Sequence, residues 1–156
     1  MPKRYGQRCP VAKSLEFLGE RWTLLVIRDL LSGPKRFQDL LASLDGIAPN
    51  VLSERLKVLE DHGIVAREFY SEHPPRAAYT LTPRGQDLGK VVGALAVWGS
   101  RHVHRDAVLV HDDCDAALEL KYYCPKCDTR VSGRSVHVRA RRAARASARS
   151  RRAAAR

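Results

Sequence analysis

Apolar side chains recur at spacings of three and four residues in the first part of the chain, and this spacing indicates amphipathic helices. The stretches that carry it are 11–18, 21–31, 36–44 and 49–62. Gly19, Ser32–Pro34 and Asp45–Gly46 separate them, because glycine and proline disfavour the continuation of a helix. Pro49 favours a helix start, since its missing N–H would have no partner at the first helical position. The pattern therefore predicts four helices before residue 63.

The hydrophobic period changes after Gly63. Residues 64–70 and 76–81 have the pattern of two strands, and residues 71–75 between them are rich in turn formers. Two strands joined in this way predict a β-hairpin. Helices that lead into a hairpin are the layout of a winged helix-turn-helix, so the predicted fold is mainly α with a small β-hairpin wing.

A last helix is predicted after the hairpin. Thr82 is a favourable N-cap and Pro83 a favourable first residue, and the apolar spacing extends this helix to residue 104. It lies outside the predicted DNA-reading unit and is free to form a homodimer. The longest uncharged apolar stretch, 91–99, is well short of the roughly twenty residues that a transmembrane helix needs, so no membrane association is predicted.

The helix at 49–62 has two different faces. Advancing 100° per residue brings Leu52, Leu56 and Leu59 to one inward face. The outer face is short and polar, which suits the DNA major groove, where amide, hydroxyl and amino groups contact base edges. Basic residues before the third helix and near the hairpin tip are candidates for phosphate contacts. The predicted DNA-binding residues are Lys35, Arg36, Pro49, Asn50, Ser53, Glu54, Lys57, His73 and Arg76.

These assignments have alternatives. Glu54 would repel phosphate, but it could accept from a cytosine amino group or pair with Lys57. The helix could be an ordinary amphipathic surface helix, and the basic side chains ordinary solvated charges. The alternative function is a winged helix that binds a protein partner without sequence-specific DNA binding, which would place apolar or aromatic anchors on the outer face.

Five segments within residues 9–105 follow a known pattern: Cys9–Val11, Gly19–Leu30, Arg36–Leu40, Gly46–Leu56 and Tyr79–Gly85. In these segments the chain resembles the HxlR-type winged helix-turn-helix transcriptional regulators, relatives of the MarR group. The resemblance implies a homodimeric transcription regulator that binds an inverted-repeat operator in double-stranded DNA and dimerises through the helix at 83–104. The chain departs from the family pattern at Gly89 and Gly93, because two glycines make the dimer helix less rigid than one rich in leucine and alanine. No phosphate loop, nucleophile elbow or paired carboxylates are evident, so an enzyme is not predicted.

The resemblance also singles out Cys9. Some HxlR-type proteins sense electrophiles or oxidants through the cysteine of this Cys-Pro step, which implies a redox-sensing role for Cys9. Such chemistry requires a thiolate, which Arg8 and the N-terminus of the following helix would favour. The alternative is a buried, unreactive cysteine.

Three further cysteines lie in the segment 106–138, at the spacing His111-x2-Cys114-x9-Cys124-x2-Cys127. The CPKC sequence at 124–127 is typical of a zinc knuckle. The predicted cofactor is one structural zinc ion, with the ligands His111, Cys114, Cys124 and Cys127. His137 and His104 are rivals for the fourth position. A redox dithiol and three unconnected thiols are the alternatives.

Charge changes this picture only at the C-terminus. The formal net charge is +11, and residues 139–156, with eight arginines and no acid, supply +8 of it. This tail has no apolar residue larger than alanine, so we predict that it is disordered. It would bind polyanions without sequence preference or simply aid solubility. The predicted organisation is a winged-helix domain at 1–105, a Cys-rich, zinc-knuckle-like extension at 106–138 and the tail. Cysteines without a visible secretory signal favour the cytoplasm.

Overall fold

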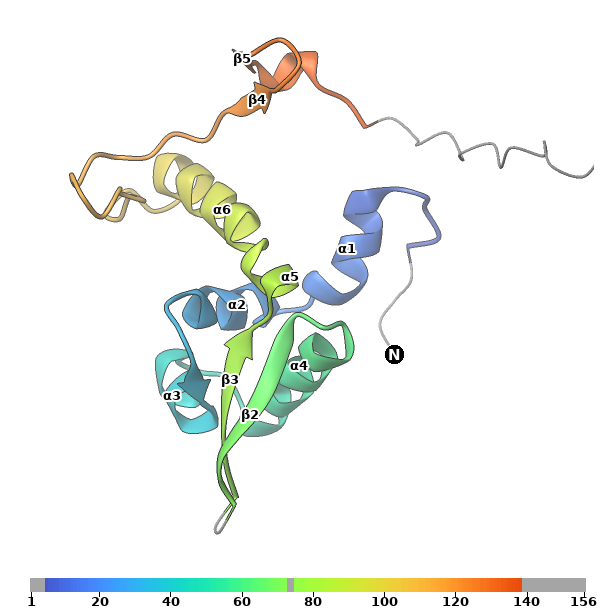
Figure 1. Cartoon of the computed structure of the whole chain (residues 1–156), viewed down its shortest axis with the longest axis vertical. Coiled ribbons are helices and arrows are strands. Elements are labelled where there is room, and N and C mark those ends of the chain that lie inside the picture. The colour runs from blue at the N-terminus through green and yellow to red at the C-terminus, as the bar shows by residue number, and fades with distance from the viewer. Residues whose placement is uncertain (1–4, 73–74, 139–156) are drawn as a thin grey trace, which may run out of the picture. The chain divides into compact units, whose positions relative to one another are not determined.

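The computed structural model describes residues 5–72 and 75–138, and the chain forms two compact units, Met1–Leu118 and Glu119–Arg156. The helices of the first unit are α1 (Pro10–Leu18), α2 (Thr23–Leu31), α3 (Phe37–Ser43), α4 (Pro49–Asp61), α5 (Pro83–Gln86) and α6 (Gly89–His102) (Figure 1). Its strands are β1 (Lys35–Arg36), β2 (Val65–Glu72) and β3 (Pro75–Leu81). The Arg-rich tail and His73 lie outside the described residues, so their predictions are not tested.

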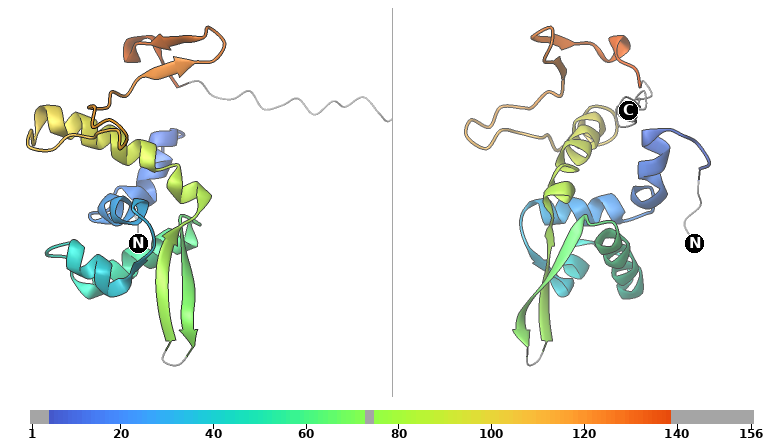
Figure 2. Two further views of the ribbon diagram at one scale, coloured as in Figure 1. Left: turned by 60° about the vertical axis from the view of Figure 1, so that its left-hand side comes forward. Right: turned by 45° about the vertical axis from the view of Figure 1, so that its right-hand side comes forward.

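The strands form one antiparallel sheet in the order β1-β3-β2. The predicted hairpin is therefore confirmed as β2 and β3, and Figure 2 shows it extending beyond the helices. Strand β1 was not predicted, because its two residues are too short for an alternating pattern. Lys35 of β1 and Arg67 of β2 both pair with Tyr79 of β3, so these three side chains share one face of the sheet.

The core of the first unit joins α4 to α2 and to the start of the hairpin. Leu52, Leu56 and Leu59 of α4 are at most 1% exposed, which confirms the predicted inward face. Other buried side chains of this cluster are Val26, Ile27 and Leu30 of α2, Leu40, Leu44, Ile64, Val65, Tyr79 and Leu81. Burying a side chain of this size contributes roughly 1.5–3 kcal/mol relative to leaving it exposed, so this packing sets the orientation of α4.

An ion pair adds a polar link on the flank of α4. The Arg55 side chain is 12% exposed, and its guanidinium lies 3.1 Å from Oε1 of Glu54 and 3.8 Å from Oε2 of Glu20. Glu20 belongs to the loop between α1 and α2. Arg55 therefore connects α4 to this loop and leaves less of its charge available to solvent.

The prediction of one continuous helix at 83–104 is wrong, because the chain forms two helices there, the short α5 and then α6. Thr82 Oγ1 accepts the Gly85 N–H at 3.1 Å, as predicted for an N-cap, and the Thr82 N–H donates to the Ile64 carbonyl. A Cβ at Gly85 would lie 2.1 Å from the Ile64 carbonyl oxygen. The first turn is therefore held against the base of β2, and the chain changes direction at Asp87–Leu88 before α6 begins.

The second unit contains a small hairpin of β4 (Tyr122–Cys124) and β5 (Thr129–Val131), followed by the 3-10 turn η1 (Gly133–Ser135). Cys124 pairs with Thr129, so the CPKC sequence forms the turn of this hairpin. None of the described residues 119–138 is buried. In the described part of the whole chain, no helix is long and apolar enough to cross a bilayer.

The contact at Gly85 generates a prediction about stability. Gly85→Ala should lower the free energy of unfolding by more than about 2 kcal/mol, because the new methyl group would overlap the Ile64 carbonyl oxygen. Gly99→Ala is the matched control, since a Cβ at Gly99 in α6 meets nothing within 4 Å and alanine favours a helix. Urea unfolding followed by circular dichroism measures both. Equal stability of the two variants would contradict the assignment of Gly85 as a close-approach position.

Candidate nucleic-acid interface

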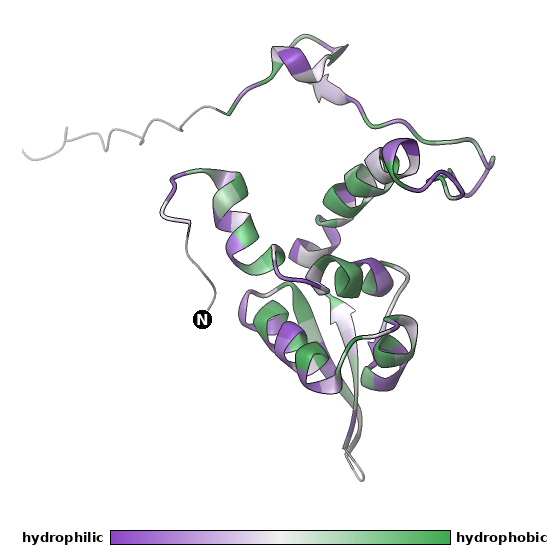
Figure 3. Ribbon diagram, turned by 180° about the vertical axis from the view of Figure 1, so that it is seen from behind, coloured by the Kyte–Doolittle hydropathy of each residue, from purple (hydrophilic) through white to green (hydrophobic). Residues whose placement is uncertain are grey.

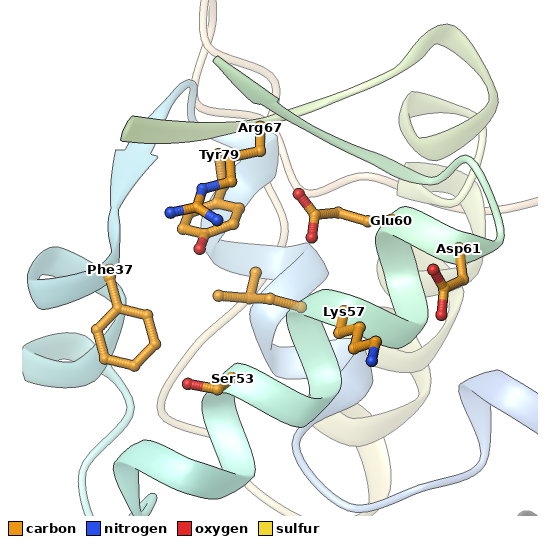
Figure 4. Close-up of a pocket in the computed structure, with 8 residues that line it drawn as sticks. Phe37, Ser53, Lys57, Glu60, Asp61, Arg67 and Tyr79 are labelled. Carbon is orange, nitrogen blue, oxygen red and sulfur yellow. The ribbon is translucent and has the colours of Figure 1, made fainter. Parts of the chain in front are cut away.

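The exposed face of α4 changes in character along the helix. Its N-terminal half presents the amide of Asn50 and the hydroxyl of Ser53 to solvent, and the ammonium group of Lys57 is exposed one turn further along. Its C-terminal half presents the carboxylates of Glu60 and Asp61 near the hairpin (Figure 4). An anionic ligand would therefore be favoured at the N-terminal half, which is the end of a recognition helix that contacts base edges in helix-turn-helix proteins.

Glu54 is the one carboxylate within this N-terminal half. It forms its ion pair with Arg55 rather than with Lys57, the partner considered from the sequence. The pairing balances the Glu54 charge and leaves Lys57 exposed. The repulsion that Glu54 would exert on phosphate is therefore reduced, while a carboxylate oxygen can still accept a hydrogen bond.

An open groove of about 690 Å³ separates α4 from the hairpin. One side is lined by α4, with Ser53 and Lys57 and also the carboxylates of Glu60 and Asp61. Arg67 and Tyr79 of the hairpin line the other side, and Phe37 at the start of α3 closes one end (Figure 4). Polar donors thus border the groove from both the helix and the wing. This arrangement suits an extended polar ligand that lies between the helix and the wing.

Arg67 is a candidate residue that the sequence prediction missed. Its guanidinium carbon lies 4.8 Å from the centroid of the Phe69 ring and 5.9 Å from that of Tyr79. Stacking on these rings holds the charged group in a defined position beside the groove. The strand pattern alone could have identified Arg67. Val65, Arg67 and Phe69 are alternate residues of one strand, so their side chains lie on the same face, and the buried Val65 makes this the core side of the wing.

The remaining predicted contacts lie at several places around this groove. Lys35 is half-buried in β1, and the Arg36 backbone N–H donates to Oδ2 of Asp39 at 2.9 Å in the first turn of α3. Pro49 is the exposed first residue of α4, and Arg76 is exposed on β3. The structure places these residues, but it does not test whether they contact DNA.

Cys9 lies apart from these residues, at the start of α1. It is the N-cap residue, it is half-buried, and its carbonyl accepts the Lys13 N–H at 3.0 Å. Cys9 therefore stands where the unpaired N–H groups of a nine-residue helix are located.

Two of the four predicted zinc ligands belong to the first unit and two to the second. In the first unit, Nδ1 of His111 and Sγ of Cys114 are 3.3 Å apart in a loop closed by a bridge between Val110 and Ala117. In the second unit, Cys124 and Cys127 flank the hairpin turn as free thiols. Among the described residues, no three His, Cys, Asp or Glu side chains form one metal-binding group. The four-ligand zinc site stays a prediction.

Hydrogen bonds around this turn change two pKa values. Backbone and side-chain groups of Cys127, and the Lys126 backbone, donate to Cys124 and lower the pKa of its thiol. The Tyr123 hydroxyl donates to Oδ1 of Asp128 at 2.5 Å, and this bond raises the pKa of Tyr123. The turn therefore stabilises a thiolate at Cys124, while Tyr123 stays protonated as a donor.

Known proteins share this arrangement of helices and hairpin. Residues 17–107 match the HxlR-like helix-turn-helix family. An uncharacterized HTH-type transcriptional regulator of Mycobacterium tuberculosis, Rv3095, is 35% identical over 130 residues, which cover 81% of this chain and 82% of that protein.

Two solved structures are similar as well. A putative transcription factor from Pseudomonas aeruginosa, PA1374, superposes with a TM-score of 0.67 and 36% identity, covering 87% of this chain and 94% of the other. The oxidized form of the redox regulator HypR superposes with a TM-score of 0.57 and 33% identity, covering 60% of this chain and 97% of the other. These relatives are transcription regulators, not enzymes. The chain belongs to the HxlR-like helix-turn-helix family of transcription regulators.

Proposed function

We propose that this regulator binds an inverted-repeat operator in double-stranded DNA as a homodimer, with α4 in the major groove and the β2–β3 hairpin as the wing. One observation carries the proposal. The same helix buries Leu52, Leu56 and Leu59 in the core and presents short polar donors on its exposed N-terminal half. A rigidly held helix with this face has the features of a recognition helix.

Each polar side chain then has a role that its chemistry allows. The Asn50 amide can pair with the edge of an adenine, Ser53 can donate to several bases, and Lys57 can reach a guanine or a phosphate. Glu54, balanced by Arg55, can accept from a cytosine amino group. Arg67 joins the predicted phosphate contacts, Lys35, Arg36, His73 and Arg76. Phosphate contacts position the protein on the duplex, and base contacts select the sequence.

A winged helix that binds a protein partner is the competing proposal. Protein interfaces gain most of their affinity from aromatic and arginine anchors in desolvated pockets. The exposed residues of α4 are instead Pro49, Asn50, Ser53, Glu54, Lys57 and Asp61, and Arg55 is largely buried. The composition of this face therefore supports DNA as the ligand.

The dimer is proposed through α6. Leu88 and Val92 pack against the core, but Val91, Leu95 and Trp98, which follow at spacings of four and three, are 43%, 50% and 58% exposed. Figure 3 shows the hydrophobic character of this helix. A stripe of large apolar side chains in water is costly, and such patches commonly mark interfaces. Covering the stripe with the same helix of a second copy would also create the two-fold symmetry that an inverted repeat requires.

Substitutions in α4 and in the hairpin should affect DNA binding differently. Asn50→Ala should cost about 1–3 kcal/mol of specific affinity, because a base contact is lost. Arg67→Ala should weaken specific and nonspecific binding alike and should reduce the slope of log affinity against log salt by about one, because a phosphate contact is lost. Fluorescence anisotropy of the full chain with DNA from upstream of its own gene, in excess nonspecific competitor, measures both.

Gln86→Ala, an exposed substitution in α5, is the control and should leave binding unchanged. Unchanged specific affinity of the Asn50→Ala variant, with the fold intact by circular dichroism, would argue against α4 as the reading helix. It would favour the protein-partner alternative instead.

We further propose that Cys9 senses thiol-oxidising conditions in the cytoplasm. The Cys9 thiolate would attack a disulfide, form a mixed disulfide and release the other sulfur as a thiolate. The Cys9 thiolate of a second copy could then attack the mixed disulfide, which forms a Cys9–Cys9 disulfide and releases the remaining sulfur as a second thiolate. Its position at the N-cap of α1 supports this chemistry. The similar protein HypR, named a redox regulator, supports it independently.

Diamide, which oxidises two thiols to a disulfide and is itself reduced to the hydrazine, should change the DNA affinity of the reduced chain by about 5–150-fold, the usual range of coupling between two sites. Dithiothreitol should restore the original affinity. Cys9→Ser should abolish the response, and a Cys124→Ser/Cys127→Ser variant should keep it. A full response in the Cys9→Ser variant would refute the sensing role of Cys9.

A further inference from the structure

Positive charge in this chain is concentrated in the second unit. Residues 119–156 contain 12 of the 28 lysines and arginines but only two of the 17 acidic residues, so they carry +10 of the formal net charge of +11. Residues 1–118, which contain the candidate DNA-binding helix, carry +1. Much of the affinity of a protein for nucleic acid comes from cations that neutralise phosphates. The second unit therefore has the charge of a nucleic-acid-binding module.

Most cations in the described part of this unit have no acidic partner. Both of its carboxylates are engaged, because Glu119 lies 2.6 Å from Nζ of Lys121 and Asp128 accepts the hydroxyl hydrogen bond of Tyr123. The cations that are exposed and outside any ion pair among the described residues are Lys126, Arg130 and Arg134. Their charge is available to an anionic ligand.

An open groove of about 470 Å³ lies along the hairpin of this unit. Leu120 and Tyr122, which are 51% and 60% exposed, line it together with the unpaired cation Arg130. Tyr122 pairs with Val131 across the two strands, and a Cβ at Gly133 would lie 3.6 Å from Cε2 of the Tyr122 ring. The backbone at Gly133 thus lies beside the ring without a side chain to cover it. The groove combines an exposed aromatic ring with a cation.

The exposed ring distinguishes between two kinds of nucleic acid. Proteins bind unpaired bases by stacking them on aromatic side chains that lie in a positively charged groove. The bases of a duplex are already stacked on one another and offer no face to such a ring. Tyr123 holds its hydroxyl against Asp128, whereas Tyr122 lies in the groove. The position of Tyr122 therefore favours a single strand over a duplex.

We propose that this groove binds single-stranded nucleic acid, with one base stacked on the Tyr122 ring and a neighbouring phosphate paired with Arg130. Binding is noncovalent. Every base has a face that can stack on the ring, so the site has little sequence preference. The groove belongs to the second unit and α4 to the first, so this site does not depend on the proposed operator binding.

Fluorescence anisotropy of the full chain with a labelled oligothymidylate of about 12 nucleotides tests the stacked base. Tyr122→Ala should weaken binding about 5- to 150-fold, the range for the loss of one stacked base. Tyr122→Phe keeps the ring and should bind within about twofold of the wild-type chain. Tyr5→Ala removes a tyrosine of the first unit that is 54% exposed and should have no effect. Equal affinity of the Tyr122→Ala variant and the wild-type chain would overturn the proposal.

Arg130 has a readout that does not depend on the ring. Arg130→Ala should reduce the slope of log affinity against log salt by about 0.7, because one phosphate contact with a single strand is lost. The Arg-rich tail is present in every variant, so it does not produce this difference. Unchanged hydrogen exchange of the β4 and β5 amides shows that each variant keeps its hairpin. An unchanged slope in a variant with an intact hairpin would overturn the phosphate contact.

A duplex of the same length separates base stacking from contact with phosphates alone. Tyr122→Ala should leave the affinity for this nonspecific duplex within about twofold of the wild-type chain, because no base face is available to the ring. An equal loss of affinity for duplex and single strand would overturn the single-strand site. Asn50→Ala should bind oligothymidylate like the wild-type chain, and Tyr122→Ala should keep its affinity for the operator. The two proposals can therefore fail separately.

Discussion

Burial of the leucine face of α4 is the constraint on which the candidate interface depends. Leu52, Leu56 and Leu59 fix the rotation of the helix about its axis, because exposing any one of them would cost roughly 1.5–3 kcal/mol. The opposite face of the helix, with Asn50, Ser53 and Lys57, is then necessarily exposed. The candidate interface therefore needs no stabilisation of its own, and its residues are free to be selected for a ligand.

The wing is fixed by a second contact in the same core. Ile64 and Val65 are buried at the base of β2, and the turn at Thr82–Gly85 packs against the Ile64 carbonyl. The angle between helix and wing is thus set by core residues, which places Arg67 across the groove from Ser53 and Lys57. The same turn determines where α6 begins, so the groove between α4 and the hairpin and the proposed dimer helix depend on one small region.

The parts of this structure that follow from local periodicity could be predicted from the sequence. The three leucines, the outer face with Asn50 and the hairpin after Gly63 are examples, because spacing within one element determines them. The division of α5 from α6 could not be predicted in this way, since it depends on contact of Gly85 with the distant Ile64. Strand β1 depends likewise on the pairing of Lys35 with the distant Tyr79.

Selection of binding sites from the whole genome tests the central claim most directly. The full chain would be mixed with sheared genomic DNA at physiological salt and with excess nonspecific competitor, and the recovered fragments would be sequenced. The account predicts one enriched inverted repeat, with half-site centres about one helical turn, roughly 10 base pairs, or a multiple of it apart. Recovered fragments that share no sequence motif would contradict sequence-specific reading by α4, and a motif without two-fold symmetry would contradict the homodimer.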